Sequence, residues 1–499
     1  KNKDKDLIEA YESYKKILKA ISKLDLDMKI QIIYGMLNFY NEVKRTAIDA
    51  FDFIDAESGQ SHNVTVESCD FTDVYANGKN YVKGADVKEA NNWKFVNCTA
   101  NEKMMNLLHY SGGSQNLVVN GGTVKAYYGI HIDSSVGGLF EGVAFESAER
   151  GFTLDGKANN TGEIVNTLKN VSFKNIDTPI FASIGNTDQS IRVFNIEGNV
   201  TSENYTAFTE DERVKFVLTA TDATLQAQEG LNVTTSVAGH IVDYADGKYY
   251  LRVPNYVAAI GETKYESLQA AIDAAVDNDE IDVIDDITLG IDDADQLCDN
   301  QYKSFFNVNG KTITIDLNGY TVKAILGGDL AANAVSALVS TENESNLTIK
   351  DSSDEKTGTM WIDNVIEVYS LVFQYDNSIV TIESGNYKLN VCGNGRGMVY
   401  SNDDEKVTVN GGNFYLGNVG TLSNGSPWIF NASGQNTKNI IVNGGTFNAD
   451  ILHQYYPFEV MNSKEKALQN NGDGTWTMVD AVAYVDEQHK SGQYYTNYV

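Results

Sequence analysis

Proline and cysteine are scarce in this chain of 499 residues, which contains 4 of each. Four cysteines are too few to hold a chain of this length together as a disulfide scaffold. The sequence also lacks any apolar run of about 18 residues or more, the length that a transmembrane helix requires. These absences predict neither a disulfide-rich fold nor a membrane span.

Basic residues are few, with 38 Lys and Arg against 68 Asp and Glu and a formal net charge of -30. Binding to nucleic acid depends on clustered Lys and Arg that neutralise phosphates, so nucleic acid is excluded as an expected partner. An acidic surface of this kind is typical of a soluble secreted or cell-surface protein. We therefore expect an extracellular or cell-surface location.

The residues that are abundant favour many short strands. The chain has 42 Gly, and Val, Ile, Thr, Tyr, Phe and Asn dominate long stretches, which is the composition of strands joined by tight turns. A chain of this length exceeds what one ordinary compact core holds. Composition and length together favour an elongated repeat structure.

Short alternating strands recur along both halves of the chain. In the second half the central residues of the copies are spaced 34, 33, 27 and 33 apart, and in the first half the copies recur at about 21 to 29 residues. Such a unit cannot bury its apolar face alone, but stacking copies about 4.8 Å apart gives every strand a parallel neighbour. The sequence predicts an all-β fold, a parallel β-helix. The central residues of the second half are Ile315, Ile349, Ile382, Val409 and Val442.

The corners of the predicted coils have their own pattern. Asn-Gly-Gly occurs at Asn120, Asn410 and Asn443, where a sharp corner calls for a positive φ and stacked Asn side chains can hydrogen-bond along the axis. Cys69 and Cys98 occupy equivalent places 29 residues apart, which predicts a stacked pair of buried thiols and no required disulfide.

Amphipathic segments divide the chain into two tandem coils. A coil of strands has an exposed edge at each end, and a helix or hairpin placed there covers it. Helical patterns at the start of the chain and again near its middle are followed by alternating strands. The predicted parts are a capping helix at 1–23, a first parallel β-helix at 24–210, a β-rich transition at 211–255, a second parallel β-helix at 256–450 with its capping helix at 266–276, and a C-terminal cap with the start of a further segment at 451–499.

The stretches AAIGETKYESLQAAIDAAVDNDEIDVIDDI, VTVNGGNF and IVNGGTF resemble segments of the pectate-lyase-like right-handed parallel β-helix superfamily, and more narrowly of repeat-bearing bacterial surface proteins. The resemblance implies right-handed coils. It does not imply one activity, because the fold hosts lyases, glycoside hydrolases, phage tailspikes and non-catalytic adhesins. Asn186, Thr187 and Asp188 resemble the first motif of polygalacturonases, but the motifs that complete the set are missing, so no catalytic role is carried over.

Polar residues recur at matching places of the first coil. YGIHIDS and RGFTLDG lie 22 residues apart, MNLLHYS precedes the first of them by 22 residues, and NYVKGAD precedes that by 26. Alternation along a strand would turn these polar positions outward onto one face. One predicted column holds Lys83, His109, His131 and Thr153, and a second holds Ala85, Ser111, Asp133 and Asp155.

This face is the predicted functional site. Two carboxylates one rung apart lie about 5 Å from each other, the separation that retaining glycosidases use, and their repulsion would raise the pKa of one of them. Asp133, Asp155 and His131 are thus the candidate catalytic residues, and no cofactor is required, although Asp133 and Asp155 also suit Ca²⁺. The candidate ligand-binding residues are Lys83, His109, Ser111, Arg150 and Thr153.

Three functions remain open at this point. The first is a secreted or surface protein that binds a polysaccharide or a host-surface glycan without catalysis, with 28 Tyr available for contact area. The second is a polysaccharide lyase or glycoside hydrolase that uses His131, Asp133 and Asp155. The third is a phage tail fibre or tailspike, which requires trimerisation.

Overall fold

The computed structural model describes residues 15, 28–30, 52–56, 62–71, 83–102, 104–157, 159–185, 187–290, 297–298, 303–327, 334–403, 406–423, 425–433, 440–451, 466–481, 483–485 and 493–495. The capping helix predicted at 1–23 lies outside the described residues except for Lys15, as does most of the predicted segment 451–499.

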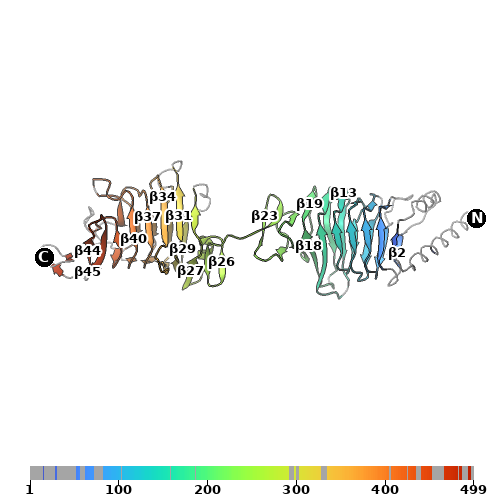
Figure 1. Ribbon diagram of the computed structural model, residues 1–499, viewed down its shortest axis with the longest axis horizontal. Helices are drawn as coiled ribbons and strands as arrows, with labels where there is room; N and C mark the ends of the chain where they lie inside the picture. The colour runs from blue at the N-terminus through green and yellow to red at the C-terminus, as the bar shows by residue number, and fades with distance from the viewer. Residues whose placement is uncertain are drawn as a thin grey trace, which may run out of the picture. The chain divides into compact units, whose positions relative to one another are not determined.

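The chain forms two compact units, Lys1–Pro254 (unit 1) and Asn255–Val499 (unit 2) (Figure 1). Each unit is built from long sheets of mostly parallel strands, and α3 (Leu268–Ala274) is the one helix whose two ends lie within the described residues. The all-β prediction is confirmed, and the arrangement is consistent with a parallel β-helix.

Unit 1 contains three sheets, each named here by one central strand. In each sheet, strands from successive turns of the chain lie side by side, so residues more than 20 apart in sequence become neighbours. The β18 sheet runs β1 (Met28–Ile30), β3 (Val64–Glu67), β6 (Lys94–Val96), β9 (Val118–Asn120), β12 (Leu139–Glu141), β15 (Glu163–Lys169), β18 (Ile191–Glu197), β20 (Val214–Leu218) and β22 (Val233–Thr235).

The other two sheets of unit 1 follow the same order of turns. The β11 sheet runs β2 (Asp52–Ala56), β5 (Lys83–Lys88), β8 (Asn106–Ser111), β11 (Ile130–Ile132), β14 (Arg150–Asp155) and β17 (Thr178–Ser183). The β13 sheet runs β4 (Asp70–Phe71), β7 (Thr99–Ala100), β10 (Thr123–Val124), β13 (Ala144–Glu146), β16 (Ser172–Lys174), β19 (Asn199–Glu203), β21 (Thr224–Gln226), β24 (Lys248–Arg252) and β23 (Ile241–Ala245).

Apolar side chains fill the interior of unit 1 in stacked rows. The rings of Phe145 and Phe173 stack with centroids 5.1 Å apart, and Phe152 packs edge-on against Phe140 at 4.8 Å. All four side chains are buried. Each buried ring removes a large apolar area from water, and inward residues on neighbouring rungs give the coil its cohesion.

An antiparallel hairpin ends the β13 sheet of unit 1. β23 and β24 pair antiparallel with each other, and β24 pairs antiparallel with β21. The hairpin lies inside the range 211–255 that the sequence predicts as a β-rich transition. It covers the backbone edge that a last parallel strand would leave open.

Unit 2 repeats the plan with three sheets. The β33 sheet runs β26 (Thr263–Tyr265), β25 (Ala258–Ile260), β27 (Asp279–Val283), β30 (Thr312–Asp316), β33 (Asn346–Lys350), β36 (Ile379–Ile382), β39 (Val407–Val409) and β42 (Ile440–Val442). The β34 sheet runs β28 (Ile287–Leu289), β31 (Thr321–Leu326), β34 (Thr359–Asn364), β37 (Asn386–Leu389), β40 (Asn413–Leu416), β43 (Thr446–Phe447), β45 (Trp476–Asp480) and β44 (Lys466–Asn470). The β35 sheet runs β29 (Phe306–Asn309), β32 (Val339–Glu342), β35 (Val372–Gln374), β38 (Gly397–Ser401) and β41 (Trp428–Ala432).

The helix predicted at 266–276 is present as α3, at the start of unit 2. The Ser267 side chain caps its N-terminus by accepting a hydrogen bond from the Ala270 amide at 3.0 Å. Leu268, Ala271 and Ile272 are buried, so the predicted apolar face packs on the core. The last described strands, β46 (Ala483–Val485) and β47 (Gln493–Tyr495), form a separate antiparallel pair.

The Asn-Gly-Gly corners differ in one respect from the prediction. The asparagines keep ordinary backbone angles, whereas the glycines take the positive φ, with Gly412 at 107° and Gly445 at 113°. The predicted side-chain ladder is present, because Asn443 Nδ2 donates to Asn410 Oδ1 at 2.9 Å. Asn120 donates to Glu141 at 2.9 Å. Cys69 and Cys98 are both free and buried, in agreement with the sequence.

Candidate functional site

The β11 sheet carries the predicted face of unit 1, and its register forms one continuous column. Asp86 pairs with His109, His109 with His131, His131 with Thr153, and Thr153 with Phe181. Neighbouring positions in such a column are about 4.8 Å apart. The column (the His131 column) therefore runs straight across five strands.

The first position of the column differs from the prediction. Lys83 pairs with Asn106, and Asp86 takes the place beside His109. Ala85 pairs with Leu108, and Ser111 pairs with Lys88. The prediction assumed a spacing of 26 residues, whereas residues 86 and 109 are 23 apart, because the loop between β5 and β8 is not the same length as the later ones.

The two imidazole rings of the column stack on each other. The His109 and His131 ring centroids are 4.4 Å apart with an angle of 29° between the planes. His109 Nδ1 lies 3.4 Å from Asp86 Oδ1, and Lys83 Nζ donates to Asp86 Oδ2 at 3.0 Å. Burial would raise the pKa of Asp86, but the bonds and charges of His109 and Lys83 outweigh it and lower the pKa to about 2. Asp86 is therefore an anion that holds one end of the stacked pair.

Asp155 holds the other end. Its Oδ2 lies 2.7 Å from His131 Nε2. This hydrogen bond from His131 holds the pKa of the Asp155 carboxyl below its usual range. The expectation that repulsion from Asp133 prepares Asp155 as an acid is wrong, because the nearest charge partner is an imidazole.

Asp133 has a different environment. Its Oδ2 accepts a hydrogen bond from the Gly112 amide at 3.4 Å, and its Oδ1 accepts from the amide and hydroxyl of Ser134. These contacts are those of a carboxylate that fixes a turn. With Asp133 bonded to amides and Asp155 to an imidazole, the two carboxylates are engaged with separate partners, which does not favour a shared Ca²⁺.

Two of the predicted ligand-binding residues are not accessible. Ser111 and Thr153 are each only 4% exposed. Thr153 Oγ1 donates to the Tyr128 carbonyl at 3.1 Å, because the turn before β11 lies over it. Strict inside-outside alternation therefore fails at these two positions.

Arg150 lies between two aromatic rings at the far end of the column. Its guanidinium carbon is 3.5 Å from the Phe181 ring centroid and 4.4 Å from that of Tyr128. The guanidinium also lies 3.4 Å from Glu149 Oε1. Tyr127, which is 37% exposed, tilts against Tyr128 at 4.6 Å. A planar cation between rings is held in place, which gives this end of the face a fixed shape.

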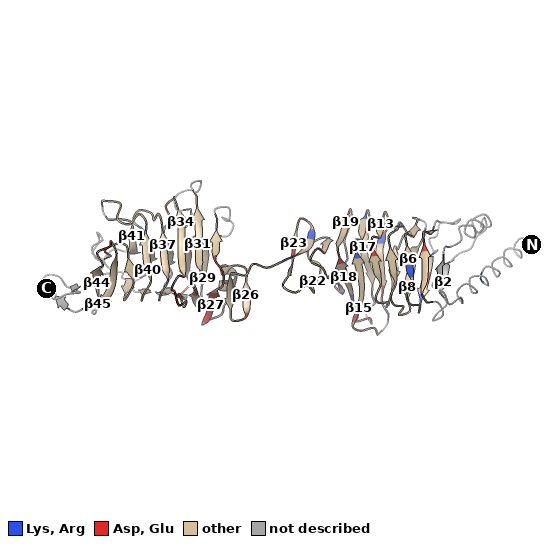
Figure 2. Ribbon diagram, viewed as in Figure 1, with Lys and Arg blue, Asp and Glu red and all other residues tan. Residues whose placement is uncertain are grey.

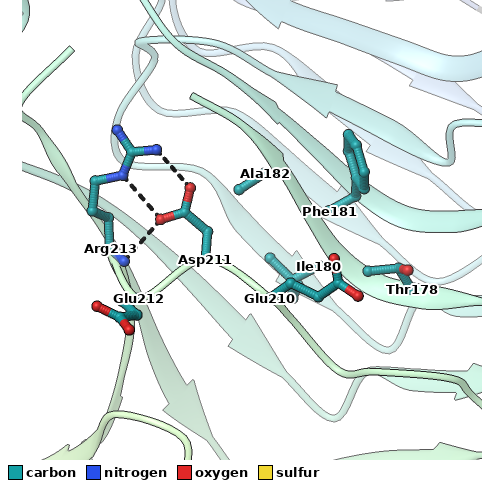
Figure 3. A pocket seen from close by; sticks show the side chains of 8 residues that line it. All are labelled: Thr178, Ile180, Phe181, Ala182, Glu210, Asp211, Glu212 and Arg213. Atoms are coloured by element: carbon teal, nitrogen blue, oxygen red, sulfur yellow. Dashed lines mark hydrogen bonds and ion pairs between the residues drawn. The ribbon is translucent and has the colours of Figure 1, made fainter. Parts of the chain in front are cut away.

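A pocket of about 570 Å³ adjoins Phe181 where the column ends. On one side Arg213 forms hydrogen bonds to both carboxylate oxygens of Asp211, and Phe181 and Thr178 lie on the opposite side (Figure 3). The pocket exists because the segment after residue 204 runs along the edge of β17 in place of a further strand, with the Ile180 amide donating to the Phe208 carbonyl at 2.9 Å. The lining residues are Thr178, Ile180, Phe181, Ala182, Glu210, Asp211, Glu212 and Arg213.

A buried ion pair supports the face from inside. Arg192, on β18, is 2% exposed and lies 3.1 Å from Asp188, which is 1% exposed. The guanidinium also donates to the carbonyls of Asp133 and Asp155, each at 2.7 Å. Arg192 thus ties together the two turns that carry the predicted aspartates.

Asp188 is the residue that resembles a polygalacturonase motif, and here its contacts are structural. It accepts hydrogen bonds from the Lys157 amide at 2.8 Å and from the Ser190 amide at 2.8 Å, in addition to its pairing with Arg192. Asn186 lies outside the described residues. The sequence reasoning missed Asp86, Tyr128, Phe181 and Arg192. For Arg192 the available signal was a lone arginine in an apolar strand.

Unit 2 contains an acidic cluster on β27 and β30, and Figure 2 shows acidic residues along β27. Ligand atoms of Glu280, Asp282 and Asp316 lie within 4.8 Å of one another. Lys350 Nζ lies 2.7 Å from Glu280 and 3.4 Å from Asp316. Burial, together with the charges of Glu280 and Asp316, raises the pKa of Asp282. Lys350 already supplies the positive charge that a cation would bring.

Comparison of the chain with protein-family models, with curated proteins and with solved structures finds no match in any of the three. Among the described residues, no helix combines the length and apolar character needed to cross a bilayer. The function is therefore argued from the site itself.

Proposed function

We propose that the chain is a secreted or cell-surface protein of two tandem right-handed coils, akin to the repeat-bearing surface proteins of the pectate-lyase-like superfamily, and that unit 1 binds a glycan without cleaving it. The His131 column and the pocket beside Phe181 form the binding face. An extended ligand suits a face in which one side chain per rung lies in a straight line.

The observation that carries this proposal is the rigid aromatic and cationic end of the column. Arg150 held between Tyr128 and Phe181 offers ring faces and guanidinium edges, and Tyr127 beside them is exposed. Aromatic rings pack against the carbon-hydrogen faces of sugars, while charged and amide groups bond to hydroxyls. The pocket next to Phe181 gives one sugar unit a place to enter.

A glycan array tests this function. Phe181→Ala removes a ring that borders both Arg150 and the pocket, and we expect about a tenfold or greater loss of binding to the glycans that the unaltered chain retains. Lys248→Gln, at an exposed position of β24 away from the face, is the matched control. Binding that survives both Phe181→Ala and Arg150→Gln would contradict the proposal.

Cleavage of a polysaccharide is the second candidate, and one observation favours it. The 2.7 Å contact of His131 Nε2 with the ionised Asp155 orients the imidazole as a carboxylate orients a general base. In this case the face would release new reducing ends or unsaturated products from acidic or neutral polysaccharides. An Asp155→Asn variant with the same turnover as the unaltered chain would exclude this role for the pair.

A further inference from the structure

The outward side of the β34 sheet in unit 2 carries a second column, unrelated to the predicted face. Lys323 pairs with Trp361, Trp361 with Lys388, and Lys388 with Tyr415. The residues before and after each of them on its strand are buried or face inward, so these four side chains lie on the outer side. The strands β31, β34, β37 and β40 stand next to one another in Figure 1. We call this column the Trp361 strip.

One end of the strip is fixed by a closed network. Lys323 Nζ lies 3.7 Å from the Trp361 ring centroid and 2.7 Å from Asp363 Oδ2. The indole N–H of Trp361 donates to Asn390 Oδ1 at 3.2 Å, and Asn390 Nδ2 donates to Asp363 Oδ1 at 2.7 Å. The indole is therefore held in one orientation before any ligand arrives, which reduces the entropy cost of binding.

The other end of the strip is open. Lys388 Nζ lies 5.6 Å from the Trp361 ring centroid, and no described carboxylate of unit 2 lies within 4.0 Å of it. Tyr415 is 54% exposed. A lysine without an acidic partner is a conspicuous position in a chain with 68 acidic residues and a net charge of -30. The strip thus offers a cation between two aromatic rings.

The spacing and the neighbouring residues indicate the chemistry of the ligand. Trp361 and Tyr415 are two rungs apart, which is about 9.6 Å, close to the length of a disaccharide in an extended chain. Beside the strip, Thr359, Asn386 and Asn413 form a parallel column of hydroxyl and amide groups, with Asn413 Nδ2 donating to Asn386 Oδ1 at 3.0 Å. Rings, amides and one cation match sugar faces, hydroxyls and one carboxylate.

We propose that the Trp361 strip binds a polysaccharide that carries carboxylate groups, such as a chain of uronic acids. Sugar rings pack on the free side of Trp361 and on Tyr415, and a carboxylate pairs with Lys388. The amides of the neighbouring column bond to ring hydroxyls. This site goes beyond the unit 1 face, and it uses none of that face's residues.

Isothermal titration calorimetry on the full chain tests the strip with three probes: oligogalacturonate, a neutral xylo-oligosaccharide of the same length, and polyglutamate. We expect oligogalacturonate to bind, the neutral sugar to bind more weakly and polyglutamate to bind weakest, because only the first presents both rings and carboxylates. Trp361→Ala should lower the affinity for oligogalacturonate about tenfold or more, while Trp361→Phe should retain most of it.

Charge is tested separately. Lys388→Gln should lower the affinity for oligogalacturonate about fivefold to tenfold and leave the affinity for the neutral sugar unchanged. Lys264→Gln, at an exposed position of β26, is the matched control. Phe181→Ala in unit 1 should leave this binding intact, which separates the strip from the proposed unit 1 site.

Three outcomes would overturn the proposal. They are no measurable binding of oligogalacturonate, binding that is unaffected by Trp361→Ala, and equal binding of polyglutamate and oligogalacturonate. The last would indicate an acidic peptide as the ligand. Circular dichroism of each variant confirms that the strands are intact.

Discussion

The His131 column of unit 1 and the Trp361 strip of unit 2 are built by the same geometry and differ in how their charges are used. In unit 1 both imidazoles contact carboxylates, Asp86 at 3.4 Å and Asp155 at 2.7 Å. In unit 2 Lys323 has a carboxylate partner and Lys388 has none among the described residues. In a stacked coil, one position per rung sets the surface chemistry, and the side chain left without a partner indicates the charge of the ligand.

The interiors beneath the two faces differ as well. In unit 1 a buried arginine, Arg192, neutralises the buried Asp188. In unit 2 the buried Asp351 is held by backbone amides, with Gly319 donating at 2.9 Å and Gly358 at 2.7 Å. A buried ion pair depends on both partners, whereas a carboxylate bound by amides depends on the backbone alone. The comparison predicts that unit 1 is the more easily broken by one side-chain change.

The largest expected effect is that of Arg192→Met. This change leaves Asp188 buried without its cation and frees the carbonyls of Asp133 and Asp155, so the free energy of unfolding of unit 1 should fall by about 3 to 5 kcal/mol. Hydrogen exchange measured by mass spectrometry should show faster exchange in unit 1 only.

A double variant controls for the loss of charge balance. Arg192→Met combined with Asp188→Asn should recover part of the lost stability, because no unpaired charge remains inside. Equal loss in the single and double variants would mean that the carbonyl contacts, and not the ion pair, stabilise the turns. Exchange that also rises in unit 2 would contradict the separation of the two interiors.

Acid should also distinguish the two faces, with a smaller effect. The pKa of Asp86 is about 2 in the folded chain against an ordinary value of 3.8, so its contribution is fully present above about 3.8 and is lost as the pH falls through about 2. After allowance for its partial exposure, we expect unit 1 to lose about 1 to 2 kcal/mol over this window.

Asp86→Asn is the variant that checks this acid effect. Urea unfolding followed by hydrogen exchange at several pH values should give a flatter pH dependence for unit 1 in the variant. The same slope in the variant and in the unaltered chain would show that other carboxyls, and not Asp86, control the acid sensitivity.

The parts of the fold that the sequence predicts well are those that depend on regular spacing. His109, His131 and Thr153 align as predicted, since their strands recur at 22 residues and their apolar neighbours alternate. Lys83 does not, because a loop of different length shifts the register, and loop length leaves no trace in the alternation of a strand.

The contacts that depend on turns and long-range packing were out of reach. Arg192 reaches the Asp133 carbonyl across 59 residues of sequence, and Arg150 meets Tyr128 only because of the turn before β11. Such contacts come from the closure of the coil, which the strand pattern does not describe. The predicted pairing of Asp133 with Asp155 was based on rung spacing alone, and local hydrogen bonds direct the two carboxylates to other partners.

The smallest expected effect concerns a feature that the sequence does predict, the asparagine ladder at the corner of unit 2. Asn443→Ala removes the 2.9 Å hydrogen bond to Asn410, which is exposed to solvent and therefore weak. We expect the free energy of unfolding of unit 2 to fall by about 0.5 to 1 kcal/mol, measured by urea unfolding, with Lys264→Ala as a surface control that changes it less. Gly445→Ala at the same corner should cost more, since Gly445 has a φ of 113° and an added Cβ would lie 3.0 Å from the Phe447 ring. If Asn443→Ala is the more damaging of the two, the ladder and not the backbone turn holds the corner.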